Sequence, residues 1–276
     1  VHVANGIYDN CPNDEAHELF KLPDFINKMM ENKWLGSKTG QGFYKKEGKD
    51  ILSLDLDTLE YRAAKKASFA TLELTKTIEK PIDRFKVLVK GKDKAGDFYR
   101  KNFSAMFAYC SNRVPEITEE FYKIDDAMKA GFGWENGPFE IWDAIGVEKA
   151  IAMMEAEGYK PAAWVTDMLI SGNKSFYSVK NGKTCFYNIS SKLQEEKPGQ
   201  DAFIILDNIR ESHKVWGNSD ASVIDLGDGI LNLEFHSKMN TIGGGVLTAI
   251  NKAIDLAEKD YKGLVIGNQG TNFSVG

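Results

Sequence analysis

Residues 132–146 read Phe-Gly-Trp-Glu-Asn-Gly-Pro-Phe-Glu-Ile-Trp-Asp-Ala-Ile-Gly. The glycines and Pro138 mark a turn, and the residues that follow predict a short helix over 139–145 that Gly146 ends. On both sides of this stretch, apolar side chains recur every three or four residues, which is typical of amphipathic helices. We therefore expect further helices over residues 98–112, 116–130, 147–157 and 161–170. Together they predict an all-helical domain of about 90 residues.

The chain also contains a pattern of residues that recurs after roughly 140 residues, as in an internal repeat. In each copy, a Pro precedes an aromatic residue and a Met that share one helix face, and a Lys-Gly turn then leads to a Phe-Tyr pair. The first copy comprises Pro23, Phe25, Met29, Lys38, Gly40, Phe43 and Tyr44, and the second comprises Pro161, Trp164, Met168, Lys180, Gly182, Phe186 and Tyr187. Coincidence is the alternative, but the shared order of these positions favours a duplicated unit.

The segments between and after the two copies differ in character. Residues 47–96 form a highly charged connector, with an extended stretch at 51–56 and a helix expected over 59–79. The cluster of Arg62, Lys65 and Lys66 is most simply a solvated helix face, with phosphate binding as the less favoured interpretation. Residues 190–200 are polar and predict a linker or turn.

The last part of the chain predicts strands. Residues 203–206 are a strand candidate, and residues 222–226 and 230–235 flank a Gly-Asp-Gly turn as a β-hairpin. An amphipathic helix over 241–258 and a strand over 263–267 complete a β-β-α-β unit. The resulting domains are an end of the first helical repeat (1–46), a connector (47–96), the second helical repeat (97–189), a linker (190–221) and the β-β-α-β unit (222–276).

Composition excludes several classes of protein. The net charge is −5 and the isoelectric point is near 5.5, and no Lys/Arg run appears, which argues against nucleic acid as a partner. No apolar run approaches the ~20 residues that span a bilayer. The three cysteines, Cys11, Cys110 and Cys185, form neither a disulfide framework nor a metal-binding pair. We therefore expect no metal, no membrane association and a cytoplasmic location.

Residues 132–146 resemble the C-terminal helical domain of 3-hydroxyacyl-CoA dehydrogenases. Residues 32–44, Asn-Lys-Trp-Leu-Gly-Ser-Lys-Thr-Gly-Gln-Gly-Phe-Tyr, resemble the closing signature of the same domain. The two-copy arrangement is similar to the multifunctional β-oxidation enzymes. The resemblance implies a mainly α fold of helical repeats like the 6-phosphogluconate dehydrogenase C-terminal domain. Its structural signature residues in this chain are Lys38, Gly40, Gly42, Phe43, Tyr44, Gly137, Pro138 and Phe139.

The resemblance also limits the chemistry that this chain carries. Oxidation of a 3-hydroxyacyl-CoA needs bound NAD and a general base, and the family places both on a Rossmann domain. The Gly-Gly-Gly run at 243–245 lacks the preceding strand and the spacing of a dinucleotide-binding turn. His2, His17, His213 and His236 lie outside any matching motif. We therefore expect no catalytic or NAD-binding residue here, only substrate-cleft cover and packing between repeats or subunits.

From Val223 onward, the chain resembles the opening of an enoyl-CoA hydratase, or crotonase, domain. The resemblance assigns weak coenzyme A binding to Lys238, Met239 and Asn240, and it places Gly276 directly before the first backbone donor of the oxyanion hole. This implies an incomplete α/β crotonase-like segment, cut one residue before that donor. The leading interpretation is a central fragment of a bifunctional enzyme, inactive by itself.

Two other interpretations stay open. The first is a stand-alone helical interaction or assembly module without catalysis. The second is independent binding of coenzyme A by the short α/β end. In the leading interpretation, acyl-CoA substrates and NAD belong to the full-length enzyme, and the helical repeats associate with each other or with a second copy.

Overall fold

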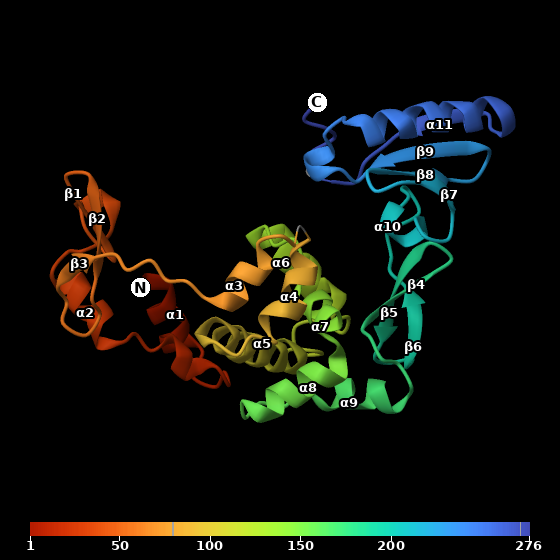
Figure 1. The fold of residues 1–276 in the computed structure, drawn as a ribbon. Helices are drawn as coiled ribbons and strands as arrows, with labels where there is room; N and C mark the ends of the chain where they lie inside the picture. Colours follow the sequence, from red (N-terminus) through yellow and green to blue (C-terminus); the bar gives the residue numbers. More distant parts are fainter. Residues whose placement is uncertain (79, 271) are drawn as a thin grey trace. The chain divides into compact units, whose positions relative to one another are not determined.

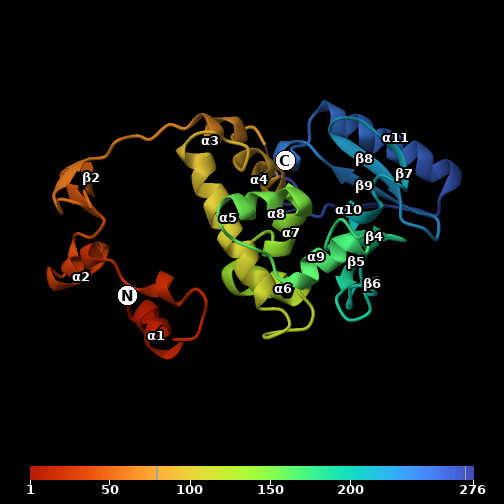
Figure 2. The same ribbon diagram turned by 90° about the horizontal axis from the view of Figure 1, so that it is seen from below.

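A computed structural model describes residues 1–78, 80–270 and 272–276 and divides the chain into two compact units, Val1–Asp167 and Met168–Gly276. Figure 1 shows the elements in chain order, and Figure 2 shows the same elements from below.

The first unit opens with short elements and a small antiparallel sheet. These are α1 (His2–Asn10), η1 (His17–Phe20), α2 (Asp24–Glu31), η2 (Ser37–Thr39), β1 (Tyr44–Glu47), β2 (Asp50–Leu54) and β3 (Tyr61–Ala63). The extended stretch expected at 51–56 is confirmed by β2 for residues 51–54. Of the helix expected over 59–79, only α3 (Ala70–Thr75) forms among the described residues, whereas residues 61–63 form β3. Tyr61 instead pairs with Leu54 of β2, and its hydroxyl donates to the carbonyl oxygen of Gly42 over 2.6 Å. The last residue of that predicted helix, Glu79, lies outside the described residues.

A helical body follows, and most of its helices are where the periodicity predicted them. It comprises α3 (Ala70–Thr75), α4 (Pro81–Leu88), α5 (Lys94–Asn112), α6 (Tyr122–Phe132), α7 (Pro138–Ile145), α8 (Val147–Ala156) and α9 (Ala163–Ile170), whose last residues belong to the second unit. The helix expected from 116 begins only at Tyr122, since the Thr118 hydroxyl accepts from the Glu120 N–H in a local turn.

Aromatic rings form the core of this body. Phe107, Phe121, Phe139 and Trp142 are fully buried. The ring of Phe107 stacks on Trp142 with a centroid separation of 4.9 Å, which joins α5 to α7. Burial of each such ring contributes on the order of 2–3 kcal/mol, so the apolar stripes seen in the sequence account for most of the packing. Figure 2 shows α5 running along α4, α7 and α8.

The second unit begins with an antiparallel sheet of β4 (Tyr177–Lys180), β5 (Lys183–Asn188) and β6 (Leu193–Glu196). This sheet corrects two expectations. The segment 97–189, predicted to be a helical repeat, ends in two strands, and the segment 190–200, predicted to be a linker, contains β6. The Asn188 carboxamide oxygen accepts from the backbone N–H groups of Ser190 and Ser191. Lys192 adopts a φ of 58°, so the chain reverses tightly and β6 pairs with β5.

A second sheet has the strand order β10-β9-β8-β7, with β7 at Lys214–Gly217, β8 at Ala221–Asp225, β9 at Ile230–Phe235 and β10 at Gly263–Ile266. The predicted hairpin is confirmed by the antiparallel pairing of β8 with β9, and β10 is a parallel edge strand, as expected. Helix α11 (Gly244–Asp260) covers one face of this sheet (Figure 1). Its residues Val246, Ala249 and Ala253 share one apolar core with Val223, Leu231 and Leu233 of the sheet.

The opposite face of this sheet carries α10 (Leu206–Ile209), whose Leu206 and Ile209 pack on Ile224. The strand expected at 203–206 is therefore wrong. The carboxamide of Gln269 explains why, because it accepts from the Leu206 N–H and donates to the Ile204 carbonyl oxygen, both over 2.6 Å. These backbone groups are thus satisfied by a side chain and not by a neighbouring strand.

The expected fold class is confirmed only in part, because helices share the chain with three sheets. Over the described ranges, no helix combines the length and apolar character that a membrane span requires. Among the same residues, no group of three His, Cys, Asp or Glu side chains could hold a metal ion.

Candidate functional site

The two segments singled out as coenzyme A-binding and oxyanion-adjacent lie together in the second unit. Lys238–Asn240 form a 3-10 turn, η3, directly before α11. The Asn240 side-chain amide donates to the Asn272 carbonyl oxygen over 2.9 Å, and the Ser274 hydroxyl donates to the Asn240 carbonyl oxygen over 2.6 Å. The Ile242 N–H donates to the Gly276 carbonyl oxygen over 3.1 Å. The structure therefore brings Asn240 and Gly276 into one loop cluster, although they are far apart in the sequence.

The backbone of this cluster has an unusual course. Met239 and Asn240 adopt left-handed conformations, with φ values of 56° and 55°. Such conformations cost free energy for residues other than glycine and cluster at functional sites. The Met239 side chain is 57% exposed, and the Gly276 N–H donates to the Ser274 hydroxyl over 3.0 Å. The roles predicted for Lys238, Met239, Asn240 and Gly276 remain predictions.

Three side-chain amides hold the loop that carries Gly276. The Asn268 carboxamide accepts from the Phe235 N–H and donates to the Phe273 carbonyl oxygen, each over 2.7 Å. The Gln269 carboxamide fixes the backbone before α10, as described above. The Asn232 side-chain amide donates to the Gly267 carbonyl oxygen over 3.1 Å. These bonds link the loop to β9 on one side and to α10 on the other.

The Gly-Pro-Phe signature lies at the start of α7, where a buried carboxylate meets the helix. Asp125 of α6 has no exposed surface, and its carboxylate accepts from the N–H groups of Phe139 over 2.9 Å and Glu140 over 3.0 Å. These are the N–H groups that a helix leaves unpaired at its first turn, and a negative charge is favourable there. Pro138 occupies the first turn, where its missing N–H costs nothing.

Gly137 lets the carboxylate approach this closely. A Cβ atom at Gly137 would lie 2.3 Å from Cβ and Cγ of Asp125 and 2.5 Å from its Cα. The Glu140 carboxylate closes the junction, since it accepts from the Gly137 N–H over 2.8 Å and lies 2.6 Å from the Lys129 ammonium. The signature therefore fixes α6 against α7.

The second signature, from Lys38 to Tyr44, forms a compact turn in the first unit. Lys38 lies in η2, and Gly40 adopts a left-handed φ of 81° directly after it. A Cβ atom at Gly42 would lie 2.8 Å from the Cα of Gly36, so only glycine fits there. The Phe43 ring contacts Phe25 of α2 at a centroid distance of 6.4 Å, and the Tyr44 side chain is exposed. This signature thus also has a packing role.

The histidines fall into four separate environments. His2 begins α1, and the His17 ring stacks on Tyr8 at a centroid distance of 4.1 Å. His213 lies 2.8 Å from the hydroxyl of its neighbour Ser212, and His236 Nε2 lies 2.9 Å from the Ser222 hydroxyl.

A buried ion pair lies on the sheet face that α10 covers. The Arg210 guanidinium donates to both carboxylate oxygens of Glu234, each over 2.7 Å, and the Glu234 side chain is 5% exposed. Glu234 and Asp207 raise the pKa of Arg210, so the guanidinium stays charged. The pair joins the end of α10 to β9, a link that the sequence did not suggest.

Residues 81–184 match the profile of the 3-hydroxyacyl-CoA dehydrogenase C-terminal domain. The match covers α4 to α9 and the Asp125–Gly137 junction. This segment is similar in sequence to the C-terminal domain of 3-hydroxyacyl-CoA dehydrogenases. The resemblance to this domain noted at residues 132–146 is confirmed, and the Asp125 carboxylate beside Gly137 gives a physical reason for the Gly-Pro-Phe sequence there.

Curated relatives align with nearly the whole chain. A Bacillus subtilis (strain 168) protein described as a probable 3-hydroxyacyl-CoA dehydrogenase is 44% identical over 277 residues, covering 100% of this chain and 35% of the relative. Proteins from Rickettsia felis and Rickettsia prowazekii, whose names assign them to a fatty acid oxidation complex trifunctional enzyme, are 25% and 24% identical. The two alignments cover 96% and 99% of this chain, and 33% and 34% of the respective Rickettsia proteins. The chain thus spans about a third of these relatives. No solved structure matches it.

The sequence patterns did not single out Asp125. In the helix pattern it is one more polar residue, and its burial depends on the return of the chain at Gly137. The available signal was the pairing of a Gly-Pro helix start with an acidic residue twelve positions earlier. Such a pair gains meaning only once the turn between the two helices is known.

Proposed function

We propose that this chain supplies the helical, non-catalytic part of an NAD-dependent 3-hydroxyacyl-CoA dehydrogenase of fatty-acid β-oxidation. Its helices cover the acyl-CoA substrate cleft and pack as repeats or subunits, in the cytoplasm. The observation that carries this proposal is the match of residues 81–184 to the dehydrogenase C-terminal domain. The alignment of the whole chain with the Bacillus subtilis relative supports it.

NAD is not assigned to residues of this chain. A dinucleotide site needs a strand, a Gly-rich turn and a helix in succession. The Gly243–Gly245 run leads into α11, but the segment before it is the turn η3. The residues present therefore do not fit the cofactor, and none of them is given a role in hydride transfer.

The end of the chain, from Val223, is proposed to be the start of an enoyl-CoA hydratase domain. The support is the β8-β9-α11-β10 order, together with the hydrogen bonds of Asn240 to Asn272 and Ser274 and the bond from the Ile242 N–H to the Gly276 carbonyl oxygen. Weak coenzyme A binding at Lys238, Met239 and Asn240 belongs to this proposal.

Two measurements test these statements. We expect no acetoacetyl-CoA-dependent NADH oxidation by the chain alone, because neither a base nor an NAD site is assigned to it; robust turnover would refute the proposal of an inactive scaffold. Calorimetry with coenzyme A is expected to show binding weaker than about 10 μM, roughly −7 kcal/mol. Tighter binding would show that the α/β end forms an independent coenzyme A site.

A further inference from the structure

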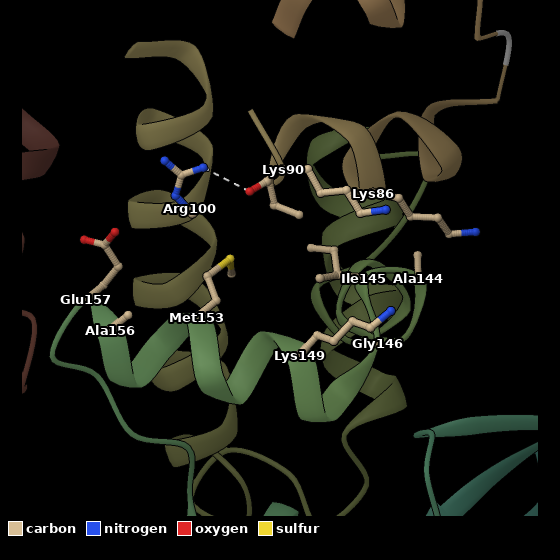
Figure 3. A pocket seen from close by; sticks show the side chains of 11 residues that line it. Lys86, Lys90, Arg100, Ala144, Ile145, Gly146, Lys149, Met153, Ala156 and Glu157 are labelled. Carbon is tan, nitrogen blue, oxygen red and sulfur yellow. Dashed lines mark hydrogen bonds between the residues drawn. The ribbon is translucent and has the colours of Figure 1, made fainter. Parts of the chain in front are cut away.

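A cavity of about 560 Å³ in the helical body is lined by cationic side chains from three regions of the chain. Lys86 lies on α4, Lys90 follows the end of that helix, and Lys149 lies on α8. Figure 3 shows Lys86 on one side of the cavity and Lys149 on the other, with Ile145 between their helices. None of these lysines stood out in the sequence, because they come together only in the fold.

The charges in the cavity are unbalanced. Glu157 is the acidic residue in its lining, and Figure 3 places it beside Arg100, on the opposite side from Lys86 and Lys149. Across the described part of the chain, the side chains of Lys90 and Lys149 form no hydrogen bond or ion pair. Two cations therefore face the cavity without a protein counter-charge.

Lys86 has a partner that it can release. Its ammonium lies 3.0 Å from the carboxylate of Asp83, one turn earlier on α4, and both side chains are about half exposed. Exposed pairs of this kind contribute little to stability, because water screens both charges. An incoming anion can therefore compete for Lys86 at little cost.

Arg100 acts differently from the lysines, because the protein already occupies its donors. Its guanidinium donates to the carbonyl oxygen of Val89 over 3.0 Å, to that of Gly91, and to the carboxylate of Asp97. The carbonyl bonds hold the turn that carries Lys90. We therefore assign Arg100 a positioning role.

The rest of the lining is mainly apolar. Val89, Ile145 and Met153 line the cavity together with the aliphatic stems of the lysines. Apolar walls with a few convergent charged groups are typical of small-molecule sites. A simple inorganic anion would leave these walls unused, whereas an anion that carries an apolar body would use both features.

We propose that this cavity binds a small anionic molecule with an apolar body, such as a phosphomonoester or a carboxylate. Lys90 and Lys149 bind the charged group, Lys86 joins them, and Val89, Ile145 and Met153 receive the apolar part. The proposal rests on the cavity alone and does not depend on the dehydrogenase function.

Calorimetry on the whole chain tests the proposal with adenosine monophosphate, octanoate and inorganic phosphate. We expect at least one of the first two to bind with a Kd below about 1 mM, and inorganic phosphate to bind at least tenfold more weakly. Binding of the nucleotide alone would identify the phosphate ester as the preferred charge, and binding of octanoate alone would identify the carboxylate. The double variant Lys90→Gln/Lys149→Gln should weaken binding tenfold or more.

Lys101→Gln is the matched control, since this exposed lysine lies on α5 outside the cavity lining, and it should leave the affinity unchanged. Circular dichroism verifies that each variant is folded. Three results would each overturn the proposal: no saturable binding of either organic anion, an unchanged affinity in the double variant, or inorganic phosphate binding as tightly as the organic anions.

Discussion

Gly137→Ala should destabilise the first unit strongly, although it adds a single methyl group. The backbone at this position, with φ −81° and ψ 170°, is open to alanine, so the cost is purely steric. The new Cβ atom would lie 2.3 Å from Cβ and Cγ of Asp125 and 2.5 Å from its backbone Cα. Backbone cannot give way as the end of a flexible side chain can, so α6 and α7 must separate.

Separation of the helices also weakens two hydrogen bonds. The buried Asp125 carboxylate would move away from the N–H groups of Phe139 and Glu140, now 2.9 and 3.0 Å distant. Overpacking costs about 1–3 kcal/mol, and a hydrogen bond to a charged group contributes about 1.5–3 kcal/mol. With partial relaxation we expect a loss of about 3 kcal/mol, which lowers Tm by roughly 6–12 °C for a unit of this size.

Thermal and urea unfolding followed by circular dichroism measure this loss. The matched control is Gly131→Ala in α6, where a Cβ atom would meet no atom within 4 Å and the helix gains propensity. This control should be neutral or stabilise the protein by up to about 1 kcal/mol. A Gly137→Ala protein as stable as wild type would refute the reasoning, because it would show that the junction is not closely packed.

Two other predictions concern buried groups. Burial, and then the charge of Asp125, raises the pKa of the Cys110 thiol from 9.0 to about 12, so this thiol should react with iodoacetamide far more slowly than the exposed Cys11 at about pH 8.5. Because the pKa of the Cys110 thiol is higher in the folded than in the unfolded protein, its contribution to stability is present below about pH 9 and is lost as the pH rises towards 12. Equal alkylation of Cys110 and Cys11, measured by mass spectrometry, would contradict the expected difference in reactivity. Arg210→Met leaves the Glu234 carboxylate buried without its partner, and urea unfolding should show a loss of about 3 kcal/mol that Arg210→Met/Glu234→Leu largely restores. A double variant as unstable as the single variant would show that the charge is not the cause.

The sequence predicted helices well where apolar spacing alone determines the structure. Residues 98–112 and 139–145 form α5 and α7, and their rings make the core that the pattern indicated. The hairpin of β8 and β9 was equally visible, because its Gly-Asp-Gly turn and its apolar strands are local features.

The predictions failed where distant residues determine local structure. Residues 203–206 read as a strand, yet Gln269, more than sixty positions later, satisfies their backbone. Residues 59–79 read as a helix, yet pairing with β2 holds Tyr61 in a strand. Asp125 and the lysines around the 560 Å³ cavity were missed for the same reason, because they have ordinary helical neighbours in sequence and meet their partners only after folding.

A chimera tests most directly the claim that this chain is the scaffold of a 3-hydroxyacyl-CoA dehydrogenase. In the Bacillus subtilis relative, the 277-residue aligned stretch is replaced by this chain, and acetoacetyl-CoA-dependent NADH oxidation is compared with that of the parent protein. We predict that the chimera retains at least about a tenth of the parent activity, which corresponds to a loss of no more than about 1.4 kcal/mol in transition-state stabilisation. A chimera that folds with the circular dichroism spectrum of the parent but oxidises no NADH would contradict the account.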